Sequence, residues 1–201
     1  MSAISAPFGF KPVMYTGAAP MSGGVRWLRA GIDTGAIAKG GLISLSTKAN
    51  GSHAVAVTAA GVAGTRSINT VLGVCQGIRY VDPNGKPTVG AQYLPASAVT
   101  AGYTQIFIQV CDDPDVIYEV QANGTLGLAD VGQNVETAVF TADATKKLSN
   151  TTVTSPSVLT TATWRIVDIV EDATNTAGDA FTRIRVRINP GYHMYNIATG
   201  L

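Results

Sequence analysis

Charged residues are scarce in this chain, and their scarcity excludes several classes of protein. Only 13% of the 201 residues are charged, well below the usage of roughly 25% in ordinary soluble domains. The net charge of +1 gives no excess of Lys and Arg of the kind that general nucleic-acid binders need to neutralise phosphates. We therefore expect no nucleic-acid partner. Low charge favours association, so the composition is typical of a subunit that works within an assembly.

Long hydrophobic runs and cysteine motifs are also absent. No stretch of about 18 apolar residues occurs, so the sequence predicts no transmembrane helix and no membrane partner. The first residues lack a basic segment followed by an apolar one, which argues against a signal peptide and indicates synthesis in a cytoplasm. Cys75 and Cys111 lie in apolar runs without a metal-binding pattern. We expect buried free thiols, with a single disulfide as the alternative.

Residues arranged for catalysis or cofactor binding are missing as well. His53 and His193 are isolated, and neither a nucleophile elbow nor a phosphate-binding glycine loop occurs. The densest acidic group is Asp112, Asp113, Asp115 and Glu119, whose oxygen atoms are of the type that binds Ca²⁺. This group lacks the glycine and the distant glutamate of an EF-hand loop, and a proline between the aspartates favours a turn. We predict no catalytic residue, no metal, no cofactor and no enzyme activity.

Glycine, threonine and β-branched residues are abundant, and their pattern predicts β-structure. Alternating apolar segments separated by turn signals indicate eight strands at 25–30, 42–46, 53–58, 71–80, 104–110, 116–121, 164–170 and 181–188. Asn50-Gly51 predicts a hairpin between the second and third of these strands. The only weak helical candidates are 59–63 and 142–148, and 143–163 is typical of a surface excursion. We expect an all-β fold, a single antiparallel β-sandwich or barrel-like domain over residues 26–201.

Residues 1–25 differ from the rest and predict an extended N-terminal arm. Prolines at three positions remove backbone donors, so this segment is neither a helix nor a central strand. Phe8, Phe10 and Tyr15 have no core of their own within the arm and need apolar partners elsewhere. The arm either packs along its own domain or docks on a neighbouring subunit, and we favour docking.

Three arginines alternate with aliphatic residues near the C-terminus. Arg183, Arg185 and Arg187 lie on one face of a predicted strand, because successive side chains of a strand point to opposite sides. The simpler interpretation is a solvated outer face partnered by Asp168 or Glu119 from neighbouring strands. The alternative is a docking face for an acidic partner, since Arg pairs carboxylates in a bidentate manner.

Five segments spread over nearly the whole chain resemble a group of tailed-phage virion proteins. These segments are residues 5–12, 73–80, 93–95, 113–121 and 178–181. The chain is thereby similar to the capsid decoration family, also called cement or head-stabilising proteins. The resemblance implies a β-rich structural subunit, made in the bacterial host, that binds the outer surface of an icosahedral capsid as a dimer or trimer. Its implied partners are the major capsid protein, which it cements to neighbouring copies, and itself.

The resemblance brings no motif whose residues can be transferred, so contact candidates come from the residues themselves. We select the aromatic side chains of the arm and of the C-terminal tail and, less directly, the three arginines. The candidates are Phe8, Phe10, Tyr15, Arg183, Arg185, Arg187, Tyr192 and Tyr195. The alternative function is a β-sandwich receptor- or glycan-binding module of a phage tail or fibre, which predicts grouped exposed aromatics and a Ca²⁺ ion at the aspartate turn.

Overall fold

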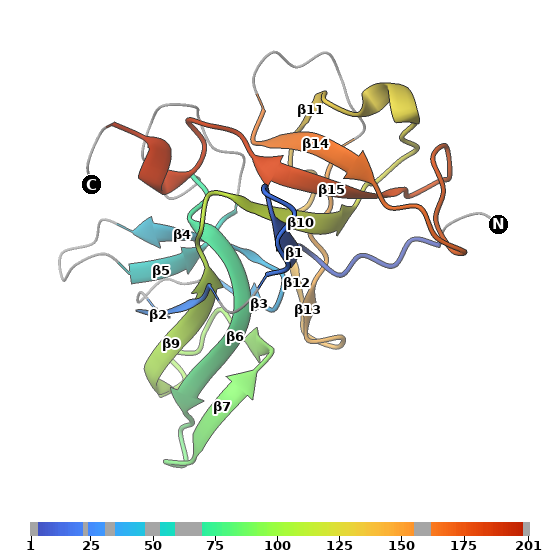
Figure 1. Cartoon of the computed structure of the whole chain (residues 1–201). Helices are drawn as coiled ribbons and strands as arrows, with labels where there is room; N and C mark the ends of the chain where they lie inside the picture. Colours follow the sequence, from blue (N-terminus) through green and yellow to red (C-terminus); the bar gives the residue numbers. More distant parts are fainter. Residues whose placement is uncertain are drawn as a thin grey trace.

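The chain folds into antiparallel sheets that pack face to face. The computed structural model describes residues 4–21, 24–30, 35–46, 53–58, 70–154 and 162–198. Within these ranges it holds fifteen strands and two single turns of 3-10 helix, η1 (Leu128–Asp130) and η2 (Met194–Asn196). The strands form a sandwich-like arrangement (Figure 1), which confirms the predicted all-β fold class.

The first sheet has five antiparallel strands and contains the most regular pairing of the molecule. In spatial order its strands are β1 (Lys11–Tyr15), β10 (Val116–Gln121), β15 (Arg183–Ile188), β14 (Trp164–Ile169) and β11 (Asn134–Val135). Strand β15 lies between β10 and β14, with Tyr118 opposite Val186 and Ile166 opposite Val186 on the other side. The three long strands were predicted from apolar runs interrupted by polar residues, and the alternation is complete only in β15.

The second sheet is built around β6, the longest strand, and curls strongly. In spatial order its strands are β2 (Arg26–Arg29), β9 (Thr104–Cys111), β6 (Gly73–Val81), β4 (Leu42–Ser46) and β5 (His53–Ala56), with β7 (Pro87–Ala91) paired to the far half of β6. A single bridge from Ala30 to Ala54 joins its two edges. Over the residues described, this curl does not close into a barrel.

Two short ribbons complete the fold. They pair β3 (Ile37–Ala38) with β8 (Tyr93–Leu94), and β12 (Ala142–Asp143) with β13 (Leu148–Ser149). The helical candidate at 142–148 is therefore wrong. The Asp143 carboxylate accepts hydrogen bonds from the backbone N–H groups of Thr145 and Lys146, and Lys147 has a φ of +59°, outside the helical region. The other helical candidate, 59–63, lies outside the described residues.

The predicted turns are present where the structure describes them. Strands β4 and β5 form the expected antiparallel hairpin, although Asn50 and Gly51 themselves lie outside the described residues. At the β6–β7 turn, the Asp82 carboxylate accepts hydrogen bonds from the N–H groups of Asn84 and Lys86, and Gly85 has a φ of +80°. These are the interactions by which aspartate and glycine favour turns.

The core consists of two hydrophobic clusters. The first lies between the two sheets and contains Trp164 and Tyr118 from the first sheet together with Val74 from the second. The second lies on the inner side of the curled second sheet, around Ile78 and Ile108. Each cluster is therefore formed by those side chains of the strands that point to the inner face of a sheet.

The two cysteines belong to different clusters. Cys75 is in the second cluster and Cys111 in the first, and both are buried free thiols, as predicted. In the β6–β9 pairing, Cys75 lies opposite Val110 rather than opposite Cys111. The alternative of a disulfide is wrong, because the two side chains point to opposite faces of one sheet.

The N-terminal segment packs on its own domain. Strand β1 is an edge strand of the first sheet (Figure 1), where Pro12 is tolerated because an edge strand need not donate on both sides. Phe10 is 1% exposed and stacks on Trp164 with ring centroids 4.2 Å apart. This contradicts the interpretation that we favoured, because burial in the chain's own core leaves Phe10 no surface for a neighbouring subunit.

Candidate interaction surface

Most of the aromatic contact candidates lie inside the molecule. Phe10 and Tyr192 are buried in the first core cluster, and Met194 of the tail is buried in the second. Phe8 and Tyr15 are half-buried. Among the aromatic candidates only Tyr195, with 45% of its surface exposed, presents a large accessible side chain.

Tyr195 fastens the C-terminal tail to a corner of the sandwich. Its hydroxyl donates a hydrogen bond of 2.5 Å to the carboxylate of Asp112, which also forms an ion pair with Arg26. The Arg26 guanidinium lies 5.5 Å from the centre of the Tyr195 ring. Burial raises the pKa of Asp112, and the nearby Arg26 opposes that rise. Since Asp112 directly follows β9 where the chain crosses to β10, this cluster joins the tail to the connection between the sheets.

The neighbouring aspartates form the predicted turn. The Asp113 carboxylate accepts a hydrogen bond of 2.8 Å from the N–H of Asp115, as expected for an aspartate that begins a turn. The Asp112 carboxylate, in contrast, accepts hydrogen bonds from the side chains of Arg26 and Tyr195. Among the described residues, no three His, Cys, Asp or Glu side chains gather as a metal-ion site requires.

The three arginines of β15 lie on the outer face of the first sheet. Arg183 forms ion pairs with Glu119, at 3.2 Å, and with Asp172, and Arg185 forms one with Asp168 at 3.2 Å. The simpler interpretation, an outer face partnered by Glu119 and Asp168, is therefore confirmed for these two. Arg187 forms no ion pair with any described residue and lies opposite Arg165 of β14.

An accessible surface that sequence reasoning missed lies on the outer face of the second sheet. We define the arginine–aromatic face by six side chains of β2, β9, β6 and β7. They are Trp27, Arg29, Arg79, Val89, Phe107 and Gln109. Strand register brings them together, because Trp27 lies opposite Gln109, Arg29 lies opposite Phe107, and Arg79 lies between Phe107 and Val89.

Arg79 is held at the centre of this face by two aromatic rings. Its guanidinium carbon lies 4.4 Å from the centre of the Phe107 ring and 5.0 Å from that of Trp27. Such cation–π contacts orient the guanidinium and leave its N–H groups free to bind a partner. Trp27 remains 39% exposed and Val89 75% exposed.

The arginine–aromatic face has the composition of a protein-binding surface. Tryptophan and arginine are the residues most enriched at the energetic centres of interfaces. The face has two arginines and no carboxylate, so its charge complements an acidic partner. Nothing in its geometry activates a nucleophile, so it is suited to binding rather than to chemistry.

One signal in the sequence points to this surface. The side chains that point into the core from these strands are those of Leu28 in β2 and of Ile106 and Ile108 in β9. Trp27 and Phe107 occupy the positions between them and therefore point outward, where polar residues are usual. An outward aromatic on two strands is an exception to the alternating pattern. The signal is incomplete, because only the strand register shows that the two rings flank the same arginine.

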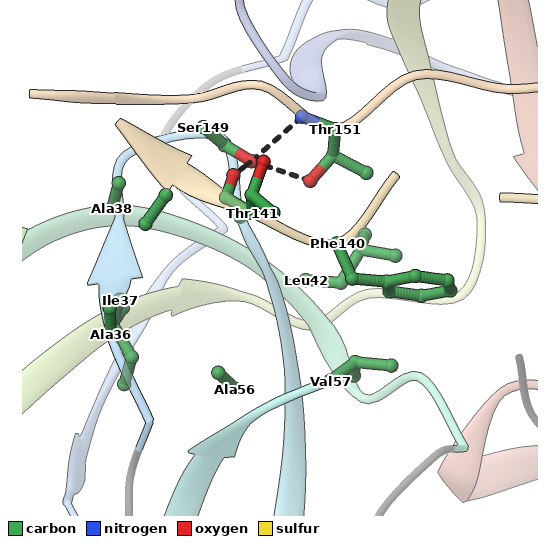
Figure 2. Close-up of a pocket in the computed structure, with 12 residues that line it drawn as sticks. Ala36, Ile37, Ala38, Leu42, Ala56, Val57, Phe140, Thr141, Ser149 and Thr151 are labelled. Carbon is green, nitrogen blue, oxygen red and sulfur yellow. Dashed lines mark hydrogen bonds between the residues drawn. The ribbon is translucent and has the colours of Figure 1, made fainter. Parts of the chain in front are cut away.

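A small pocket elsewhere shows no catalytic arrangement. Figure 2 shows hydroxyl groups of Thr151 and Ser149 on one wall of this pocket, between β3, β4 and the β12–β13 ribbon. The Ser149 and Thr151 hydroxyl oxygens are 2.5 Å apart, and Ser149 donates to the Thr141 carbonyl at 3.3 Å. The pocket has a volume of about 20 Å³, room for roughly one water molecule. No acid or base lines it, so these hydroxyls serve packing.

Comparison of the chain with protein-family models, with curated proteins and with solved structures gave no match. The helices in the described part of the chain are single turns, and none has the length or apolar character needed to cross a membrane. We therefore infer function from the residues and from their arrangement.

Proposed function

We propose that this protein is a structural virion protein that binds the outer surface of an icosahedral phage capsid and cements neighbouring major capsid subunits. The observation that carries the proposal is the arginine–aromatic face, an exposed binding surface on a two-sheet body. The resemblance of residues 5–12, 73–80, 93–95, 113–121 and 178–181 to capsid decoration proteins suggests the same role.

The face is suited to a partner that is itself a protein surface. Trp27 and Val89 supply apolar area, and Arg79, already oriented by its rings, supplies directed donors for carboxylates. A second copy of the same face is a poor match, because arginines would then meet arginines. The partner at this face is the major capsid protein, and contacts between copies, as a dimer or trimer, use other surfaces.

The mechanism is stabilisation by mass action and involves no catalysis. A ligand that binds the assembled shell and not its dissociated subunits stabilises the shell by its own binding free energy. Many equivalent copies multiply a modest contact at each site. The protein is made in the host cytoplasm, resides on the capsid surface, and needs no cofactor, nucleic acid or membrane for this role.

Binding to expanded capsids that lack the protein tests the proposal. The purified chain is added to such capsids, and occupancy is measured by co-sedimentation and located by cryo-electron microscopy. Arg79→Ala removes the guanidinium between the two rings and leaves every buried side chain in place, so folding is retained. Loss of such an interface centre weakens binding roughly 30-fold.

The matched control is Arg165→Ala, an exposed arginine of the first sheet with the same change in charge. We expect this variant to bind capsids like the wild type. Failure of the wild-type chain to bind, or equal loss in both variants, would contradict the proposal. Quantitative mass spectrometry of virions separates the alternative of a tail or fibre module, which is present in few copies, from a capsid protein present in many.

A further inference from the structure

An open groove with a volume of about 530 Å³ lies beside the half of β6 that pairs with β7. Its walls come from β6, β7, β8, the segment before β9 and the β12–β13 ribbon. Six side chains give the groove its chemistry. They are Tyr80, Gln92, Tyr93, Pro95, Tyr103 and Lys147. The Tyr80 and Tyr103 rings meet edge to face with centroids 5.0 Å apart.

A positive charge is fixed in this groove. The Lys147 ammonium lies 4.8 Å from the centre of the Tyr93 ring and forms no ion pair with any described residue. Lys147 occupies the tip of the ribbon with a φ of +59°, and its N–H donates to the carbonyl of Asp143 at 2.9 Å. A non-glycine residue in the left-handed region is uncommon and is held there by its surroundings.

Backbone hydrogen bonds hold the walls of the groove together. The Ser149 N–H donates to the carbonyl of Lys39 at 2.9 Å, and the Lys39 N–H donates to the carbonyl of Gln92 at 2.8 Å. The ribbon that carries Lys147 is thus joined through β3 to the segment that carries Gln92 and Tyr93. The backbone positions of Lys147, Gln92 and Tyr93 therefore keep a fixed spacing before any ligand arrives, which lowers the entropic cost of binding.

We infer that this groove binds an acidic saccharide, a pyranose ring that carries a carboxylate. Flat tyrosine rings present apolar faces to the C–H groups of a sugar, and their hydroxyls with the Gln92 amide bind its hydroxyl groups. Lys147 supplies the charge-assisted contact to the carboxylate. The groove has no carboxylate of its own among its lining residues, so an anionic sugar meets no repulsion there.

The groove and the arginine–aromatic face can be occupied together. Tyr80 packs against the second core cluster on the inner side of the sheet, whereas Arg79 lies against Trp27 and Phe107 on its outer face. If the proposed function holds, a subunit bound to the capsid through Arg79 directs its groove away from that contact. Saccharide binding by the free chain does not depend on the capsid role, so the two proposals fail separately.

Titration with defined oligosaccharides tests the inference. Tetragalacturonate and sialyllactose are added to the full-length chain, with fully methyl-esterified tetragalacturonate and lactose as neutral counterparts, and binding is followed by calorimetry and NMR. We expect at least one acidic probe to bind and its neutral counterpart to bind roughly tenfold more weakly. Saturation-transfer NMR should place the sugar ring protons against tyrosine rings. Absence of binding by both acidic probes, or equal binding of the neutral ones, overturns the inference.

Two lysines on the same ribbon provide a matched pair of variants. Lys147→Ala removes the charge that faces the groove, whereas Lys146→Ala removes an equal charge that faces Asp143 outside it. Both side chains are exposed, so neither variant should unfold. We expect roughly tenfold weaker binding of the acidic probe for Lys147→Ala and no change for Lys146→Ala. Equal effects would mean general electrostatic attraction and would overturn the assignment of the groove.

Discussion

Replacement of Phe10 by alanine tests the placement of the N-terminal segment. The Phe10 ring is 1% exposed, stacks on Trp164 at 4.2 Å and meets Tyr118 edge to face at 6.3 Å. Removal of a buried phenylalanine costs about 3–5 kcal/mol, which includes the loss of its aromatic pairs. In a chain of this size that loss lowers the melting temperature by roughly 6–20 °C.

Urea unfolding followed by tryptophan fluorescence and calorimetry measures the effect, with Phe8→Ala as the control. Phe8 is half-buried and belongs to neither core cluster, so its loss should cost less than about 1 kcal/mol. The reasoning is refuted if the two variants lose equal stability. The segment would then be free to dock on a neighbouring subunit, and truncation of the first residues would leave the sandwich intact.

Further predictions concern the backbone, one histidine and the two thiols. Gly9→Ala should lower the free energy of unfolding, measured with urea, by at least about 2 kcal/mol. Gly9 has a φ of +75°, and an added Cβ would lie 2.5 Å from a backbone oxygen. The control is Gly17→Ala, whose added Cβ would contact nothing and should leave stability unchanged. Burial lowers the pKa of His193 from 6.5 to about 4, so the unfolded chain takes up a proton that the folded chain does not. The free energy of unfolding should therefore fall by up to about 3 kcal/mol as the pH falls from 6.5 to 4. His193→Gln should remove this pH dependence. Parallel plots of unfolding free energy against pH for the two proteins would contradict the prediction. Burial raises the pKa of Cys75 to about 12 and also raises that of Cys111. A thiol reagent should therefore label neither cysteine in the folded protein. A disulfide between Cys75 and Cys111, seen as a shifted band on a non-reducing gel, would contradict their placement on opposite faces of the sheet.

The long strands of this fold could be predicted from sequence because each carries its own signal. Strand β10 has the predicted bounds, and β9 and β14 differ from prediction by one residue at an end. These strands are apolar runs of six or more residues interrupted by polar ones and bounded by turn residues, a pattern that indicates a buried strand. The two-residue strands, such as β3 and β8, carry too few positions for any period to show.

Contacts between distant segments could not be predicted from a single sequence. The aromatic residues of the N-terminal segment indicate a need for apolar partners, but nothing local identifies Trp164 as the ring that covers Phe10. The aspartate group shows the same limit. Its turn follows from Pro114 and Asp113, whereas the engagement of Asp112 by Arg26 and Tyr195 depends on how the tail returns to the sheet.

The candidate binding surface was missed for a related reason. Every strand of the second sheet except β7 was predicted, but an aromatic residue at one outward position of one strand is ordinary. Only the pairing of β2 with β9 and of β9 with β6 places Trp27, Phe107 and Arg79 side by side. The candidate binding surface therefore depends on strand register, which alternation alone does not specify.

Charge reversals at two positions of β15 provide a direct test of register in the first sheet. Arg187 lies opposite Arg165, so Arg187→Glu converts a like-charge pair into an opposite one and should raise stability by about 0.5 kcal/mol. Arg183 lies beside Glu119 and binds it at 3.2 Å, so Arg183→Glu creates repulsion and should lower stability by at least about 1 kcal/mol. Both changes occur on the same face of the same strand and alter the net charge equally, so general charge effects cancel in their difference. Urea unfolding at low ionic strength measures both, and shifts of the same sign would show that the strands pair in a different register.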